Sequence, residues 1–114
     1  MVRFRPFLGV SRYTDSEGNI ITYYCCQTTY LADESGEYTG LNTDAIGMVI
    51  DFDQIQNRRD CKVNAYDAFR CEIGEHSYLC WTISPEISCV IEYSADVIGE
   101  ADIFRMAESV QVPT

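Results

Sequence analysis

Lysine is nearly missing from this sequence: seven of the eight basic residues are arginines, and Lys62 is the only lysine. Eighteen acidic residues outweigh them, so the formal net charge is −10 at pH 7. Proteins bind nucleic acids and anionic membrane surfaces mainly through clustered Lys and Arg. The charge balance therefore argues against both partners, and we expect no nucleic-acid binding.

Long hydrophobic runs are also missing. No stretch approaches the roughly 20 apolar residues that span a bilayer, so we expect no direct membrane insertion of this chain. The N-terminal segment MVRFRPFLGV carries arginines within its only candidate apolar run, so no signal peptide is recognisable. Two locations stay open: the cytoplasm, or an extracytoplasmic domain whose leader or membrane anchor lies outside this sequence.

Recognisable catalytic and cofactor motifs are absent as well. The chain has no glycine-rich phosphate loop and no nucleophile-elbow sequence, so we expect no cofactor and no enzymatic activity. It has no C-x-x-C pair, and the lone His76 falls in an expected turn, so we expect no metal. A zinc site would require Cys71, Cys80 and Cys89 to converge with a fourth ligand.

The residues that are present predict one folded domain, 1–114. Hydrophobic residues make up 46% of the chain, with eight Tyr and five Phe to supply bulk. Residues 2–13 and 20–30 are rich in strand formers, and the turn formers between them predict a hairpin. Pro6 lacks an amide donor, which favours an edge position for the first strand.

Two polar loops, 32–44 and 54–60, flank a strand predicted at 46–52. After them the chain predicts a meander of short antiparallel strands over 61–66, 69–73, 78–83 and 88–93.

The turns of this meander predict its register. A four-residue turn at 74–77 would set Ile73 opposite Tyr78 and Cys71 opposite Cys80. A tight turn at Pro85-Glu86 would set Thr82 opposite Cys89. Alternation then gives a core face of Phe69, Cys71, Ile73, Tyr78, Cys80, Cys89, Ile91 and Tyr93. The opposite face receives Arg70, Glu72, Leu79, Trp81, Ile83, Val90 and Glu92.

Residues 100–111 change to a helical period, with an apolar stripe at Ile103, Met106, Ala107 and Val110. Acidic residues in the first turn suit the helix dipole, and Pro113 ends the helix. We expect the stripe to pack on the core face of the sheet. The predicted fold is therefore α+β: a curved, half-barrel-like antiparallel meander packed against a C-terminal helix.

Between Cys61 and Val110 the pattern resembles a known family. A strand with Val63-Asn64, a hairpin arm Leu79-Cys80-Trp81 and a final helix ending Met106-Ala107-Glu108-Ser109-Val110 resemble an uncharacterised bacterial extracytoplasmic family, domain of unknown function 4367. Its members lie outside the membrane of Gram-positive bacteria, some of them in anti-sigma-factor-like proteins. Their fold is similar to the half-barrel of lipoprotein carriers and the MucB/RseB regulators. Six cysteines depart from the family pattern.

An even number of cysteines in an exported domain indicates disulfides, with fifteen full pairings available to six of them. The predicted register favours a Cys71–Cys80 bridge, because directly opposed strand residues lie close enough to bond. Buried free thiols are the alternative. Adjacent Cys25 and Cys26 point to opposite faces of a strand, so at most one of them belongs to the core.

On this register Leu79, Trp81, Ile83 and Val90 lie on the face away from the helix. They form either a covered core or an apolar groove for a lipid-like or peptide ligand. The resemblance implies an extracytoplasmic, non-catalytic binding or sensing domain for an unknown protein or apolar ligand, with the outer part of a membrane-anchored regulator as one version. The alternatives are a small enzyme using the acid pair Asp51 and Asp53, or a self-association module at an exposed sheet edge.

Overall fold

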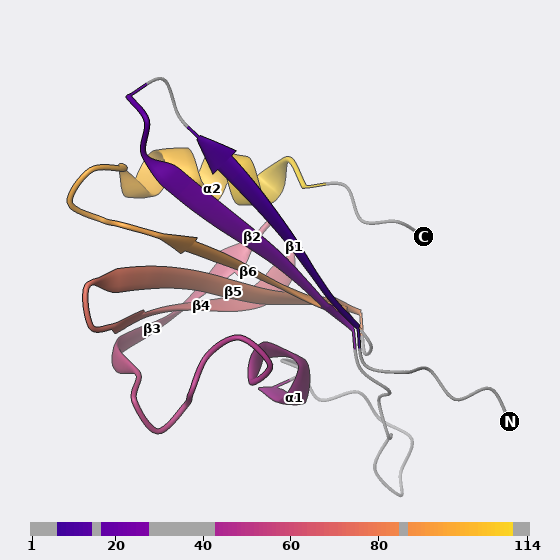
Figure 1. The fold of residues 1–114 in the computed structure, drawn as a ribbon. Helices are drawn as coiled ribbons and strands as arrows, with labels where there is room; N and C mark the ends of the chain where they lie inside the picture. Colours follow the sequence, from indigo (N-terminus) through magenta and orange to yellow (C-terminus); the bar gives the residue numbers. More distant parts are fainter. Residues whose placement is uncertain (1–6, 15–16, 28–42, 85–86, 111–114) are drawn as a thin grey trace, which may run out of the picture.

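The computed structural model describes residues 7–14, 17–27, 43–84 and 87–110. Six strands form one antiparallel open sheet in the order β1-β2-β6-β5-β4-β3 (Figure 1). The strands are β1 (Phe7–Thr14), β2 (Ile20–Gln27), β3 (Gln56–Val63), β4 (Tyr66–Ile73), β5 (His76–Ser84) and β6 (Ile87–Tyr93). The sheet consists of the hairpin β1–β2 and the meander β3–β4–β5–β6. The hairpin joins the meander where β2 pairs with β6, the last strand of the meander.

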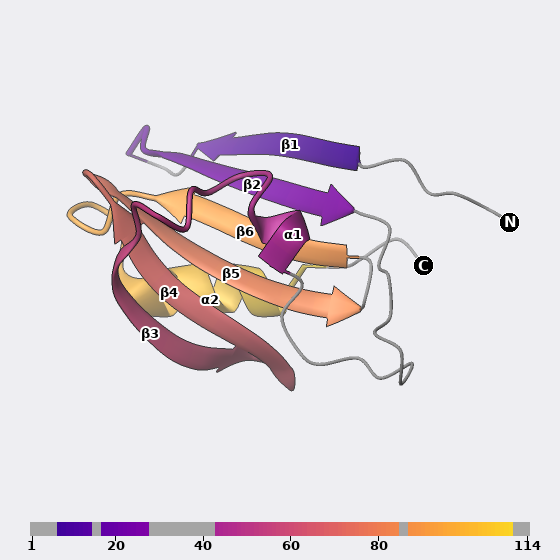
Figure 2. The ribbon, with the colours of Figure 1, turned by 90° about the horizontal axis from the view of Figure 1, so that it is seen from below.

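Two helices lie on opposite faces of this sheet. The short α1 (Thr43–Ile46) lies over β2 and β6, and the longer α2 (Glu100–Glu108) crosses the other face behind β4 and β5 (Figure 2). The predicted α+β class is therefore confirmed, with a curved antiparallel sheet packed against a C-terminal helix. The structure adds a second covering layer that the sequence pattern did not predict.

Helix α2 forms for the reasons seen in the sequence. Glu100 and Asp102 occupy its first turn, where the helix dipole favours negative charge. Ile103 and Ala107 are buried, and Met106 and Val110 pack at the margin of the same cluster. The predicted stripe therefore does dock on the sheet.

The strand predicted at 61–66 is wrong, because the chain turns within it. Asn64 adopts a left-handed backbone with φ of 53°, which Asn tolerates better than most residues, and Val63 pairs with Tyr66 across the turn. Residues assigned to a polar loop instead begin β3. This edge strand carries Arg58, Arg59, Asp60 and Lys62, and charged side chains protect an exposed edge from pairing with other chains.

The strand predicted at 46–52 is also wrong. After α1 the backbone makes successive turns, in which the amides of Val49 and Ile50 donate to the carbonyl of Ile46. Ile46 and Ile50 are buried against the face of the sheet opposite α2. Ile46 and Ile50 are four residues apart. This spacing puts two side chains on one face both of a strand and of a helical turn, so the apolar pattern did not distinguish the two.

The β4–β5 turn is shorter than predicted. Ile73 pairs with His76, so only Gly74 and Glu75 form the turn, with Gly74 at φ of 61°. The register moves by two residues, and Cys71 faces Tyr78 while Phe69 faces Cys80. A two-residue shift leaves each side chain on its predicted face, because the strand period is two.

The β5–β6 pairing differs by one residue, which has the opposite effect. The predicted register holds beside the turn, where Ser84 pairs with Ile87, but a bulge then shifts it so that Trp81 pairs with Cys89. A one-residue shift moves a whole strand to the other face. Cys89, Ile91 and Tyr93 therefore join Leu79 and Trp81, whereas Val90 joins Cys80.

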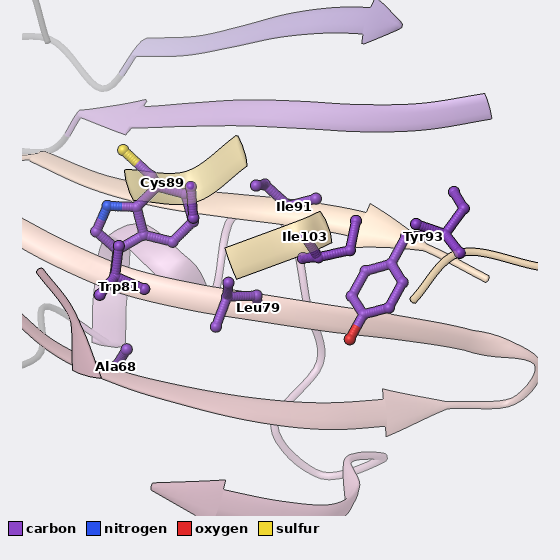
Figure 3. Packing of buried hydrophobic residues seen from close by; sticks show 10 residues of the cluster. Ala68, Leu79, Trp81, Cys89, Ile91, Tyr93 and Ile103 are labelled. Atoms are coloured by element: carbon purple, nitrogen blue, oxygen red, sulfur yellow. The ribbon is translucent and has the colours of Figure 1, made fainter. Parts of the chain in front are cut away.

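The result is two buried clusters, one on each face. Figure 3 shows the first, with Leu79 and Trp81 of β5 beside residues of β6 and with Ile103 of α2 against them. The second lies beneath α1 and the turns that follow it, around Phe69, Cys80 and Val90. Helix α2 thus packs on the face that contains Trp81, not on the face predicted to receive it.

Candidate functional site

The feature best suited to hold a ligand is a pocket of about 450 Å³. It lies where β3, β4 and β5 meet the β6–α2 connection and the start of α2. Its lining is mostly polar and includes Asn57, Arg59, Arg70, Cys71, Glu72, Ser77, Tyr93, Ala95, Ile98 and Glu100. This volume lies within the range of small-molecule sites in proteins, roughly 300–1,000 Å³.

Two arginines face each other across neighbouring strands in this pocket. Arg59 of β3 is the register partner of Arg70 of β4, so both side chains project from the same face. Like charges directly opposite each other destabilise a sheet unless an opposite charge lies between or beside them. Among the described residues, no ion-pair partner is found for Arg59.

Arg70 is held in place but is not fully bonded. Its Nη1 lies 2.6 Å from Oε1 of Glu100, in the first turn of α2, and its guanidinium carbon lies 6.0 Å from the centre of the Phe104 ring. The Nε atom is buried without a hydrogen-bond partner. Buried polar atoms are rarely left unpaired, so this guanidinium has bonding capacity to spare.

Polar groups around the arginines complete the pocket. Nδ2 of Asn57 donates to Oε2 of Glu72 at 3.2 Å, and Asn57 takes a left-handed backbone with φ of 55° beside the irregularity in β3. Burial raises the pKa of Tyr93 above its ordinary value, although Arg70 acts in the opposite direction. The Tyr93 hydroxyl therefore stays protonated and can donate a hydrogen bond to a ligand.

A second hollow, of about 560 Å³, lies between the β1–β2 hairpin and the C-terminal end of α2. Tyr13, Tyr23, Met106, Ser109 and Val110 line it, so it is mostly apolar. It lies beside the β1 edge of the sheet, where Val10 and Tyr13 each keep 50% of their surface exposed.

The groove predicted from Leu79, Trp81, Ile83 and Val90 does not form. Leu79 and Trp81 are buried under α2, Ile83 is partly buried beside them, and Val90 lies in the cluster on the opposite face. The covered-core alternative therefore holds for Leu79 and Trp81. Their predicted position away from the helix, and their grouping with Val90, were wrong, because the β5–β6 bulge reverses the side chains of β6.

The favoured Cys71–Cys80 bridge is not formed, and all six cysteines are free thiols. The two residues are not direct partners in the sheet, although their thiols are hydrogen-bonded. Donation from Cys80 lowers the pKa of Cys71, and burial raises that of Cys80 well above its ordinary value. Cys89 lies on the other face, so the three cysteines do not converge, and no cluster of metal ligands is found among the described residues.

The other singled-out groups lie on exposed turns. His76 is exposed at the β4–β5 turn, with its Nδ1 3.7 Å from Oε1 of Glu92. Asp51 and Asp53 lie in a turn after α1, not on a strand, and Oδ1 of Asp51 accepts a bond from the Asp53 amide at 3.0 Å. This bond closes a local turn, and neither carboxylate lines either of the two pockets described above.

Sequence reasoning missed the arginine pair. It placed Arg58 and Arg59 in a loop and treated Arg70 as part of the face away from the core. A turn at Asn64-Ala65 was the signal that could have found the pair, because that turn sets Arg59 opposite Arg70. Glu100 lies beside Arg70 because α2 docks on this face of the sheet, and nothing in the sequence pattern predicted this ion pair.

Comparisons with protein-family models, with curated proteins and with solved structures find no match to this chain. The resemblance to the extracytoplasmic family therefore stays a prediction. In the part of the chain that the structure describes, no helix combines the length and the apolar character needed to cross a bilayer.

Proposed function

We propose that this chain is a non-catalytic binding or sensing domain whose ligand carries a carboxylate. The observation that carries the proposal is the direct opposition of Arg59 and Arg70 in one pocket. A carboxylate between them would relieve their repulsion and could bond with both guanidinium groups. The binding energy would come from charges that the fold already holds close together.

The surroundings favour a ligand with a single negative charge. Glu72 and Glu100 share the pocket with the arginines, and the whole chain has a formal charge of −10. This field repels polyanions, so long phosphate backbones are disfavoured. A small carboxylate brings one charge and a planar pair of acceptors, which match the fork of an arginine.

The enzyme alternative has less support. Its acid pair, Asp51 and Asp53, lies on an exposed turn outside the arginine pocket. An acid–base catalyst has to reach its substrate within hydrogen-bond distance. Neither aspartate would therefore be placed to accept a proton from a ligand bound at Arg59 and Arg70.

The proposed location outside the cytoplasmic membrane depends on the family resemblance alone. Under that proposal the domain would present its pocket on the cell surface, anchored by a segment outside this sequence, and would pass the state of a bound ligand to a regulator.

Self-association is a second candidate, favoured by the β1 edge. Among the described strands β1 pairs with β2 alone, and it exposes Val10 and Arg12 on one face and Tyr13 on the other. Pairing of β1 with β1 of a second copy would extend the sheet. Sedimentation velocity over a range of concentrations tests this, and Val10→Lys should shift the distribution to the monomer; a monomer at all concentrations contradicts it.

The binding proposal is tested by titrating the chain with acetate, benzoate, succinate and octanoate while amide chemical shifts are followed by NMR. We expect at least one carboxylate to shift residues of β3, β4 and the start of α2. Arg59→Gln should weaken its binding about tenfold, the effect of losing one charge-assisted hydrogen bond.

Arg58→Gln is the matched control. Arg58 precedes Arg59 on the same strand and carries the same charge, but its guanidinium carbon lies 4.5 Å from the centre of the Phe69 ring, in the cluster on the other face. We expect less than about a twofold change, because it alters only the general field. Equal losses in the two variants, or shifts confined to other regions, would contradict a site at Arg59.

A further inference from the structure

Two cysteines lie directly opposite each other on strands that are distant in the sequence. Cys25 of β2 is the register partner of Cys89 of β6. Directly opposed residues in an antiparallel pair have Cα atoms about 4.5–5.5 Å apart, within the span that a disulfide bridges. This is the relationship that the sequence pattern had assigned to Cys71 and Cys80.

The two side chains also share a neighbour. Oη of Tyr23 lies 3.2 Å from Sγ of Cys89 and also interacts with the thiol of Cys25. One phenol oxygen within reach of both sulfurs places these sulfurs in the same small space. Tyr23 and Cys25 are two apart on β2, so their side chains leave the same face of the strand, the one that α2 covers further along.

The pair differs in exposure. Cys25 is half-buried, whereas Cys89 is fully buried beside Trp81 (Figure 3). A reagent from solution can therefore reach Cys25 first, and Cys89 can attack only a sulfur that is already within the fold. This arrangement separates an attacking thiol from a resolving thiol.

We propose that Cys25 and Cys89 are a redox-active pair that forms a disulfide between β2 and β6 when the domain meets a small disulfide oxidant such as oxidised glutathione. The thiolate of Cys25 attacks one glutathione sulfur and releases the first reduced glutathione. The sulfur of Cys89 then attacks Sγ of Cys25 as its thiol proton passes to the second glutathione, which is released. Two cysteine thiols are oxidised, one glutathione disulfide is reduced, and the two thiol protons pass to the released glutathione thiols.

The bond would act at the join between two parts of the fold. Among the described residues, the β1–β2 hairpin joins the sheet through the pairing of β2 with β6 alone. A covalent link there would fasten the hairpin and close a loop of more than sixty residues between Cys25 and Cys89. It would also remove the thiol that Tyr23 contacts, next to the hollow that Tyr23 lines.

The other cysteine pairs fit less well. Cys71 faces Tyr78, and Cys80 faces Phe69, so their hydrogen-bonded thiols belong to diagonal positions. Cys26 faces Ser88 and belongs to the cluster on the other side of the sheet. The proposal does not depend on the arginine pocket, whose two arginines lie on β3 and β4.

The test equilibrates the folded chain with oxidised and reduced glutathione at several ratios, blocks the remaining thiols by alkylation, and maps cross-links by mass spectrometry. Cleavage after glutamate separates Cys71, Cys80 and Cys89, because Glu72, Glu75, Glu86 and Glu92 lie between or beside them. We expect a cross-link between the fragments holding Cys25-Cys26 and Cys89, and a higher melting temperature for the oxidised chain.

Cleavage after glutamate leaves Cys25 and Cys26 in one fragment, so the cross-link map alone does not tell which of them is bonded. The variants Cys26→Ala and Cys25→Ala make this distinction. We expect the cross-link to persist in Cys26→Ala and to be lost in Cys25→Ala, with circular dichroism confirming that each variant folds. Should one variant fail to fold, the other and the unaltered chain still decide between the two cysteines. A cross-link of Cys71 with Cys80 alone, one that needs Cys26, or six free thiols at every ratio would each overturn the proposal.

Discussion

Trp81 and Cys89 are directly opposed on β5 and β6, and both side chains lie under α2 with 2% and 0% of their surface exposed. The opposition exists because a bulge near the β5–β6 turn shifts the pairing by one residue. It places the only tryptophan in the buried cluster beneath α2 and decides which face of the sheet the helix covers.

Trp81→Ala should destabilise the fold more than any exposed substitution. Removing a fully buried tryptophan loses its contacts and leaves a cavity, which costs about 3–5 kcal/mol in the free energy of unfolding. Urea denaturation followed by circular dichroism measures the change. Val97→Ala is the control, because Val97 keeps 51% of its surface exposed and should change stability by less than about 0.5 kcal/mol. A small loss for Trp81→Ala would contradict its packing in the buried cluster under α2.

Asn64 should tolerate glycine better than alanine. Its φ of 53° is strained for alanine, and its Nδ2 donates to the carbonyl of Glu108 at the end of α2, at 3.3 Å. Asn64→Ala loses both features, which costs about 1–2 kcal/mol, whereas glycine retains the backbone freedom. Thermal unfolding of both variants checks the order. Equal stability of the two would show that the turn does not depend on a left-handed residue.

Glu100→Gln should strengthen carboxylate binding to the pocket. The substitution removes a negative charge and weakens the hold of Glu100 on Arg70, whose Nη1 then becomes free to bond with a ligand. NMR titration with the best carboxylate of the panel should show about a threefold to tenfold tighter affinity. Glu108→Gln makes the same change of charge at the other end of α2 and should have little effect. Weaker binding in Glu100→Gln would show that Glu100 orients Arg70 for the ligand rather than competing with it.

Stability should fall at alkaline pH under reducing conditions. Burial raises the pKa of the Cys26 and Cys89 thiols from 9.0 to about 12, so the folded chain keeps protons that the unfolded chain loses. The stabilisation is complete below pH 9.0 and is lost as the pH rises towards 12. Each thiol lowers the free energy of unfolding by up to about 1.4 kcal/mol per pH unit in that interval.

Urea denaturation at a series of pH values from neutral to alkaline measures this slope. Cys26→Ala should reduce the slope, because it removes one of the buried thiols that titrate in this interval. Tyr23 and Tyr78 add to the slope at higher pH, since burial raises their pKa values as well. A slope that stays the same in Cys26→Ala would contradict the role of its buried thiol.

The local pattern of the chain was enough to predict several elements. The alternation in β4 and β5, the glycine at the β4–β5 turn and the stripe of α2 led to correct elements, because strand and helix periods are properties of the backbone. The disulfide prediction failed for a related reason: opposition of Cys71 and Cys80 depended on the length of one turn, and the two-residue turn put Tyr78 opposite Cys71 instead.

What the sequence by itself determined was the class of this protein: an acidic α+β domain with an antiparallel meander and a terminal helix. Only the tertiary structure decided which residues meet. The β5–β6 bulge selected the face beneath α2, the β2–β6 pairing brought Cys25 to Cys89, and the Asn64 turn with the docking of α2 assembled Arg59, Arg70 and Glu100. The physical reason is that periodicity is local, whereas a shift of one residue in a single pairing reverses every side chain beyond it.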